Sequence, residues 1–164
     1  MKYEKINSRP LISNYHFKDI KSMIFTFRGK QVMLDRDIAN YFGIETKRLN
    51  EQVKKNMERF PESFCFKLTR NEKNELVAKC DQFENLKHSS ALPFAFTEQG
   101  VAMLTAVIKN SQAVSASIYI MNAFVDMRKF MIKNSAILDH LGKLELVQIN
   151  TDNIILNKEL KKKE

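Results

Sequence analysis

Two short amphipathic helices separated by a glycine are the feature of this sequence that most restricts its fold. They lie in the stretch DRDIANYFGIETKRLNEQVKKNMER, which begins at Asp35. Leu34, Ile38 and Phe42 recur every four residues, so their side chains share one face of a helix. We expect the carboxylate of Asp35 to cap the start of this helix, and Gly43 to end it by adopting a positive φ.

The second helix follows the glycine turn. Thr46 stands where a hydroxyl can cap its start, and the apolar spacing predicts that it runs to about Met57 or Phe60. Its predicted inward stripe consists of Leu49, Val53, Met57 and Phe60. Two helices joined by such a turn are the sequence form of a helix-turn-helix.

The outer face of the second helix carries cations, one amide and one carboxylate: Lys47, Arg48, Asn50, Glu51, Lys54 and Lys55. This mixture suits the major groove of double-stranded DNA. Lys and Arg neutralise phosphates or donate to guanine, Asn pairs with adenine, and Glu accepts from cytosine or holds a neighbouring Arg. A charged outer face is also the rule for a helix that only faces solvent, so the helix alone leaves both interpretations open.

The overall charge favours the first interpretation. Lys and Arg number 27 against 19 Asp and Glu, which gives a formal net charge of +8 and an isoelectric point near 9.5. Part of this charge lies in the terminal KKKE, which is typical of a frayed, solubilising tail. The cluster within residues 47–55 is therefore the part of the charge that points to nucleic acid.

Length and apolar content limit the organisation of the chain. With 164 residues, 44% of them hydrophobic, it can bury one sizeable core with an appendage. No apolar run approaches the roughly 18 residues that cross a bilayer. The start MKYEKINSRP lacks the apolar core of a signal peptide, and we therefore expect a cytoplasmic protein.

Neither a metal site nor an active site is predicted. Cys65 and Cys80 need no disulfide, and His16, His88 and His140 have no Cys or His at ligand spacing, so we expect no zinc and no cofactor. The sequence has no Ser/His/Asp order, glycine-rich phosphate loop or HExxH motif. We therefore expect that the protein is not an enzyme.

Short strands flank the helix pair. Residues 20–35 predict a β-hairpin that turns at Gly29, and residues 64–68 and 92–97 predict two further strands. The later strands can form a wing, a β element that lies against the DNA backbone beside the second helix. They can instead pair with the early hairpin and form the floor of the domain. The sequence leaves this choice open.

Two capped helices are expected after the helix pair. Thr69 and Glu72 have the spacing of a capping box, which predicts a helix to about Cys80 or Phe83. The polar segment ENLKHSSA reads as a loop. Thr97 is expected to cap a further helix, and its inward stripe consists of Val101, Leu104 and Ile108.

The helix predicted at residues 111–133 has more apolar surface than packing on one domain needs. We take one of its two stripes as the candidate dimer or partner interface: Ile120, Phe124, Met127 and Met131. A homodimer would cover this surface, and so would a heterologous partner such as a repressor. A carboxy-terminal segment that folds back is the alternative; residues 137–160 predict a short coiled coil or a loose helix.

Four sequence blocks occur in a characteristic order: VMLDRDIA, ETKRLNEQVKKN, RFPESFCF and FTEQGVAML. Together they resemble the amino-terminal DNA-binding domain of the KilA-N superfamily, in the branch named after the phage open-reading-frame-six N-terminal domain. The similarity covers roughly residues 20–128. Members of that family occur in bacteriophage antirepressor-like proteins and in bacterial chromosomes, so the resemblance implies sequence-related DNA binding in transcriptional control.

The family pattern places the recognition segment at residues 45–56. Combined with the outward positions, it gives these candidate DNA-binding residues: Thr46, Lys47, Arg48, Asn50, Glu51, Lys54 and Lys55. Among them we favour Lys47, Arg48, Asn50 and Lys54 as contacts. This chain has His88-Ser89-Ser90-Ala91 where many relatives carry a glycine- and arginine-rich loop, so we expect weaker or differently targeted backbone contact there. In FTEQGVAML, Thr97 is expected to cap a helix and Gly100 to allow close packing.

The sequence therefore predicts an α+β, winged-helix-like helix-turn-helix domain with small β-hairpins and a helical carboxy-terminal extension. Residues 20–133 form the expected KilA-N-like domain, and residues 134–164 form a helical or coiled-coil-like extension. The predicted function is that of a transcriptional regulator or phage-type antirepressor, reading the major groove with the helix at 46–57. The alternative is a protein-interaction module that uses the Met-rich helix at 111–133.

Overall fold

The computed structural model describes residues 17–80 and 83–160. The chain divides into two compact units, Met1–Phe124 and Val125–Glu164. The first unit contains α1 (Phe17–Ser22), β1 (Ile24–Phe27), β2 (Lys30–Leu34), α2 (Asp35–Phe42), α3 (Thr46–Lys55), the 3-10 turn η1 (Met57–Arg59), β3 (Cys65–Lys67), α4 (Arg70–Lys79), α5 (Glu84–Lys87), β4 (Phe94–Phe96) and α6 (Glu98–Val107). Helix α7 (Ser111–Lys133) begins in the first unit and ends in the second, which also holds α8 (Ser135–Leu160).

The four strands form one antiparallel sheet in the order β1-β2-β4-β3. The predicted hairpin is confirmed, and it turns through Arg28 (φ 52°) and Gly29 (φ 70°). Two successive positive φ angles match the right-handed twist of the flanking strands, which explains why a glycine stands here. The α+β class of the sequence prediction is confirmed.

Strand β4 decides the question that the sequence left open. Phe96 is paired with Met33 of β2 on one side and with Cys65 of β3 on the other. The two later strands therefore complete the sheet begun by the hairpin and form the floor of the domain. Within the described residues they do not form a separate two-stranded wing.

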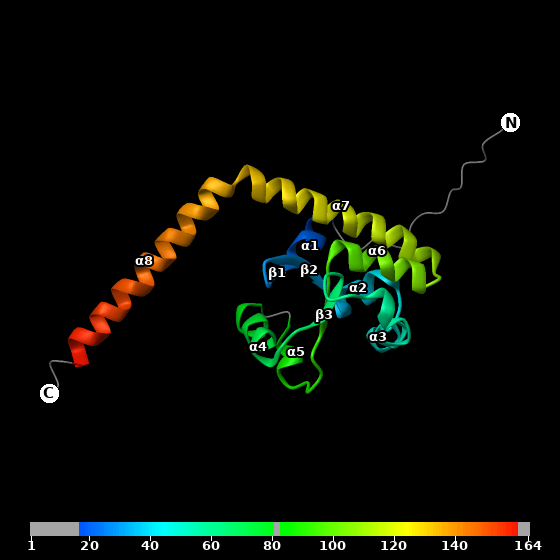
Figure 1. Cartoon of the computed structure of the whole chain (residues 1–164), viewed down its shortest axis with the longest axis horizontal. Coiled ribbons are helices and arrows are strands. Elements are labelled where there is room, and N and C mark those ends of the chain that lie inside the picture. Colours follow the sequence, from blue (N-terminus) through cyan, green and yellow to red (C-terminus); the bar gives the residue numbers. More distant parts are fainter. Residues whose placement is uncertain (1–16, 81–82, 161–164) are drawn as a thin grey trace. The chain divides into compact units, whose positions relative to one another are not determined.

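Alternate residues of the strands pack on opposite faces of the sheet. One face of the sheet is covered by a buried cluster, to which α4 contributes Leu76 and against which Leu86 of α5 packs. The cluster consists of Val32, Leu34, Phe66, Leu68, Leu76, Phe83 and Ala95. Met33 and Phe96 alternate with these residues and point to the other face, where the Phe60 ring meets the Phe96 ring edge-on at 6.2 Å. Figure 1 shows α4 and α5 on one side of the sheet and α6 on the other.

The helix pair forms as the spacing predicts, but with different caps. Gly43 adopts φ 65° and ends α2, and the Ile44 N–H donates to the carbonyl of Ala39. The residue preceding α2 is Leu34, and the residue preceding α3 is Glu45, and neither makes a side-chain capping bond. The predicted capping roles of Asp35 and Thr46 are wrong, since both are the first residue inside their helix.

Helix α3 is shorter than expected. Leu49, Val53 and Phe60 are buried as predicted, but Met57 is 51% exposed. The α-helix ends at Lys55 and is followed by the 3-10 turn η1. A 3-10 turn has three residues per turn, so the change of period rotates Met57 away from the inward stripe.

The later capping signals are confirmed. Thr69 and Glu72 form a reciprocal capping box at α4, and the Thr97 hydroxyl accepts from the Gly100 N–H at the start of α6. Helix α4 ends at Lys79, earlier than expected. The segment expected as a loop contains the single-turn helix α5. No helix of the described residues is long and apolar enough to cross a membrane.

Gly100 allows α6 to pack closely on the chain before β3. A Cβ atom at this position would lie 2.1 Å from the Phe64 carbonyl oxygen, which is backbone and cannot move aside. We expect Gly100→Ala to lower the free energy of unfolding by about 1–3 kcal/mol, as overpacking does. Urea denaturation followed by circular dichroism measures the change.

Gly142 of α8 provides the matched control. Nothing lies within 4 Å of a Cβ atom placed there. Gly142→Ala is therefore expected to leave stability unchanged or to raise it slightly, because Ala favours a helix interior more than Gly does. Equal losses in the two variants would contradict the close packing at Gly100.

Candidate nucleic-acid interface

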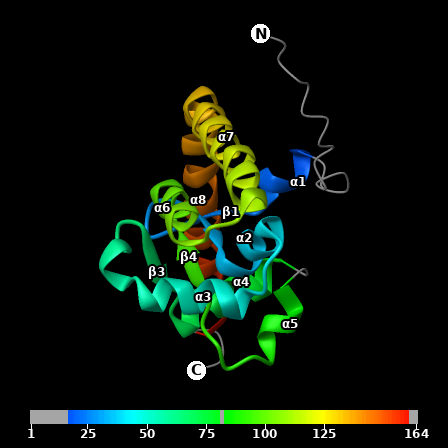
Figure 2. The same cartoon turned by 90° about the vertical axis from the view of Figure 1, so that its right-hand side faces the viewer.

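Helix α3 has one fully buried side and one exposed charged side. Leu49 and Val53 are completely buried and fix the helix to the domain. Most of the predicted DNA-binding side chains are exposed: Lys47, Arg48, Glu51, Lys54 and Lys55. Thr46 is half-buried. Figure 2 shows α3 along its length at the outside of the first unit.

Asn50 differs from the other predicted contacts. Its side chain is half-buried, and its Nδ2 donates to Asp35 Oδ2 at 2.7 Å. The same carboxylate oxygen accepts from the backbone N–H of Phe94 at 3.2 Å. Asn50 therefore points inward and links α3 to the start of α2. The sequence alone predicts that this side chain lies on the outer face of α3. Asn50 is a positioning residue in this arrangement.

Asp35 is the centre of this inner network. Its carboxylate is 4% exposed and accepts from Asn50, from Phe94 and from the N–H of Arg36 at 2.8 Å. Burial raises the pKa of Asp35, while the three hydrogen bonds oppose that rise. Asn50 and Phe94 lie far from Asp35 in sequence, so no local spacing could have revealed this network.

Asp37 is a second buried acid in α2. One of its oxygens accepts from the Arg36 guanidinium at 3.2 Å, and the guanidinium lies 4.3 Å from the centre of the Phe83 ring. The other oxygen, Oδ2, is buried and has no hydrogen-bond partner within the described residues. Burial raises the pKa of Asp37, and the charge of Arg36 partly offsets the rise.

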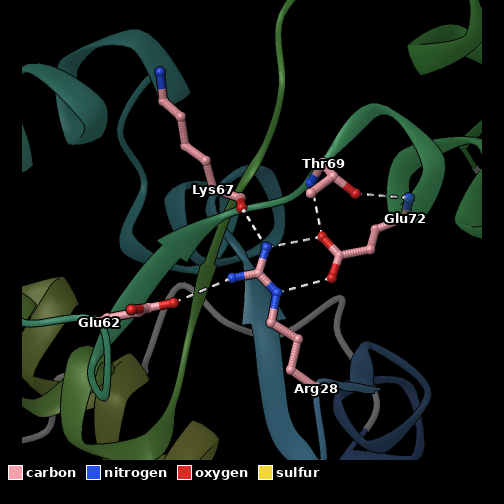
Figure 3. Close-up of polar contacts among 5 residues, drawn as sticks. All are labelled: Arg28, Glu62, Lys67, Thr69 and Glu72. Carbon is pink, nitrogen blue, oxygen red and sulfur yellow. Dashed lines mark hydrogen bonds and ion pairs between the residues drawn. The ribbon is translucent and has the colours of Figure 1, made fainter.

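Arg28 is a cation that the fold uses internally (Figure 3). From the hairpin turn, its guanidinium donates to both carboxylate oxygens of Glu72 at 2.8 and 3.0 Å, and to the Lys67 carbonyl at 3.2 Å. A longer contact of 3.4 Å joins it to Glu62. The hydrogen bonds from Arg28 lower the pKa of Glu72 to about 2. Glu72 also accepts from the Thr69 N–H, so Arg28 ties the hairpin to the capping box of α4.

The predicted partner interface needs correction. Ile120 and Phe124 are 0% and 1% exposed, because they face the core of the first unit, so they have no surface to offer a partner. Met127 is half-buried and Met131 is exposed, and both lie in the second unit. Where the burial of α7 and α8 is described, the exposed large apolar residues are instead Val114, Ile118, Tyr119, Phe130, Met131, Ile132, Ile137, Leu141, Leu144 and Val147.

The fold and this surface define a class of protein: an α+β helix-turn-helix domain whose second helix presents an exposed cationic face. A family model described as the ORF6N domain matches residues 22–107, which is more than half of the chain. The chain therefore belongs to the ORF6N domain family, as the four sequence blocks indicated. This is a phage-type, non-enzymatic domain family. No curated protein and no solved structure matches the chain.

The network around Asp35 generates a prediction. In Asp35→Asn, the amide nitrogen would replace either the oxygen that accepts from Asn50 and Phe94 or the oxygen that accepts from the Arg36 N–H, so at least one buried N–H donor would lose its acceptor in either orientation. We expect this change to lower the free energy of unfolding by about 1–3 kcal/mol, the usual cost of buried donors left without acceptors. Urea denaturation at pH 7 measures it, and wild-type stability in the variant would contradict the role of Asp35.

Asp37→Asn makes the same chemical change and serves as the control. Its amide nitrogen can occupy the position of the unpartnered Oδ2 while Oδ1 still accepts from Arg36.

Because burial raises the pKa of Asp37 above 3.8, the folded state holds the proton more tightly than the unfolded state. The wild type therefore loses stability relative to Asp37→Asn as the pH rises from about 4 through the folded-state pKa. A difference that shrinks over this range would contradict the assignment.

Proposed function

We propose that this protein binds double-stranded DNA by placing α3 in the major groove, and that it acts in the cytoplasm as a transcriptional regulator or phage-type antirepressor. One observation carries the proposal. The inner side of α3 is fully buried by Leu49 and Val53, while Lys47, Arg48, Lys54 and Lys55 are exposed on the outer side. Membership of the ORF6N family supports it, since the resemblance to this family implies DNA binding.

The exposed cations of α3 are available to an anionic partner. Within the described residues, no carboxylate forms an ion pair with Lys47, Arg48 or Lys54, whereas Arg28 and Arg36 are paired with acids. Unpaired cations on one face attract phosphates, and their binding releases the counterions that are condensed on the DNA. The exposed side chains of Lys47, Glu51 and Lys54 would contact the bases. Asn50 holds α3 in place through its hydrogen bond to Asp35.

DNA binding is tested by fluorescence anisotropy with a randomised duplex at several salt concentrations. If about four phosphates are neutralised, log affinity falls against log salt with a slope near −3.6. We expect the triple variant Lys47→Gln, Arg48→Gln, Lys54→Gln to lose most of its affinity and most of this slope. The triple variant omits Asn50, because a change there would disturb the fold through Asp35.

A charge-matched control separates the face of α3 from net charge. Arg70, Lys79 and Lys143 are exposed on α4 and α8, and their replacement by Gln removes the same number of charges. This control is expected to bind as the wild type does. If the wild type fails to bind at low salt, or if both triple variants bind equally, α3 is not a DNA-binding surface.

A second function is favoured by the second unit: association with another copy of the chain. Ile137, Leu141 and Leu144 of α8 are each more than half exposed. They are spaced by four and three residues, and the next two positions of this spacing, Gln148 and Thr151, are polar, so the apolar part of the seam comprises these three residues. A repeat of 3.5 residues is the seam of a two-stranded coiled coil, and a dimer would present two copies of α3 to DNA. A repressor protein is the alternative occupant of this seam.

Leu141→Glu tests this association. A charge in an apolar seam is expected to convert a dimer into a monomer, because the carboxylate would have to lose its water. Light scattering after size-exclusion chromatography gives the mass. Lys143→Gln, on the same helix but outside the seam, is expected to leave the mass unchanged. A monomeric wild type would contradict the homodimer.

A further inference from the structure

A groove lies between α3 and the link that joins α6 to α7. It has a volume of about 620 Å³, and its lining includes Arg48, Gln52, Lys109, Asn110 and Ser111. We propose that this groove seats one phosphate of the DNA backbone, held between Arg48 on α3 and Lys109 on the α6–α7 link. The proposal rests on the proposed function, because the phosphate belongs to the duplex whose major groove receives α3.

The charge of the groove fits an anion. Its lining contains two cations and no carboxylate, and Gln52 and Ser111 add neutral hydrogen-bond donors. Within the described residues, neither Arg48 nor Lys109 forms an ion pair. Two other hollows of the first unit differ in this respect. The hollow beside Thr46 contains Asp37 and Glu45, and the hollow between α4 and α5 contains Glu84.

Hydrogen bonds fix the wall that carries Lys109. The Asn110 Nδ2 donates to the Phe42 carbonyl at 2.9 Å, and the Gln112 Nε2 donates to the Tyr41 carbonyl at 3.3 Å. Both acceptors are at the end of α2, just before the glycine turn into α3. The residue next to Lys109 is therefore bound to the same helix that positions α3, so the backbone positions that carry the two cations are fixed with respect to each other.

Both ends of the Asn110 amide form hydrogen bonds within the protein. Its Oδ1 accepts from the Gln112 N–H at 2.9 Å, while its Nδ2 is bonded to Phe42. The Asn110 amide thus holds the link against the end of α2, and the charge that attracts a phosphate comes from Arg48 and Lys109. A contact to phosphate fixes the register of a protein on the duplex but carries no base information. Arg48 is thus a positioning contact on the DNA, and Lys109 is a DNA-binding residue outside the helix-turn-helix.

The test compares Arg48→Gln, Lys109→Gln and the double variant, using anisotropy with the randomised duplex at several salt concentrations. Each single variant is expected to bind several-fold more weakly at low salt. Because both cations hold one phosphate, the double variant is expected to reduce the salt slope by about 0.9, the value for one phosphate. Lys79→Gln, an exposed change on α4, is the matched control and is expected to retain the wild-type slope.

Several results would overturn the proposal. A slope reduced by about 1.8 in the double variant would mean that the cations hold two separate phosphates. A Lys109→Gln variant that matches the wild type, or a Lys79→Gln variant that matches Lys109→Gln, would remove Lys109 from the interface. In these cases the triple variant of α3 still loses binding, and the proposed function stands. Absence of binding by the wild type would instead reject the proposed function, and this groove with it.

Discussion

The buried carboxylate of Asp35 is the contact on which the arrangement of the first unit depends. It accepts hydrogen bonds from α3 through Asn50, from β4 through Phe94, and from the first turn of α2. Helix α3 and strand β4 thus converge on one charged group at the start of α2. Burial of that charge is unfavourable, which is why its pKa is raised, and the donors compensate for the lost water. The orientation of α3 is therefore set by a polar contact as well as by its apolar side.

Local signals in the sequence predict much of this fold. The spacing of Leu34, Ile38 and Phe42, the glycine at 43 and the Thr69 capping box correctly predicted elements whose causes lie within a few residues. The inward turn of Asn50 and the pairing of β4 depend on distant partners, and no periodicity reports them. Ile120 and Phe124 were misplaced because two apolar stripes on one helix do not reveal which of them faces the core.

The count of 27 Lys and Arg residues overstates the number of cations that a polyanion would meet on the surface. Arg28 is bound by Glu72, the Arg36 guanidinium lies over the Phe83 ring, and the buried Lys73 ammonium donates to the Ser89 carbonyl. These cations stabilise the sheet side of the domain. Among residues 17–80 and 83–160, the cations of α3 and Lys109 make no such internal contact, so they are the part of the charge that is available to a partner.

The central place of β4 has a consequence for how the chain folds during synthesis. The Phe94 N–H that bonds to Asp35 is separated from it by 59 residues, and β4 lies between the hairpin strands and β3 in the sheet. Contacts of such long range raise the contact order and form late. A nascent chain that has emerged only as far as α4 contains both helices of the helix-turn-helix, yet it lacks the strand that secures them. We therefore expect α3 to acquire its final position only after the ribosome has produced the segment that follows residue 94, well after the helix itself has been made.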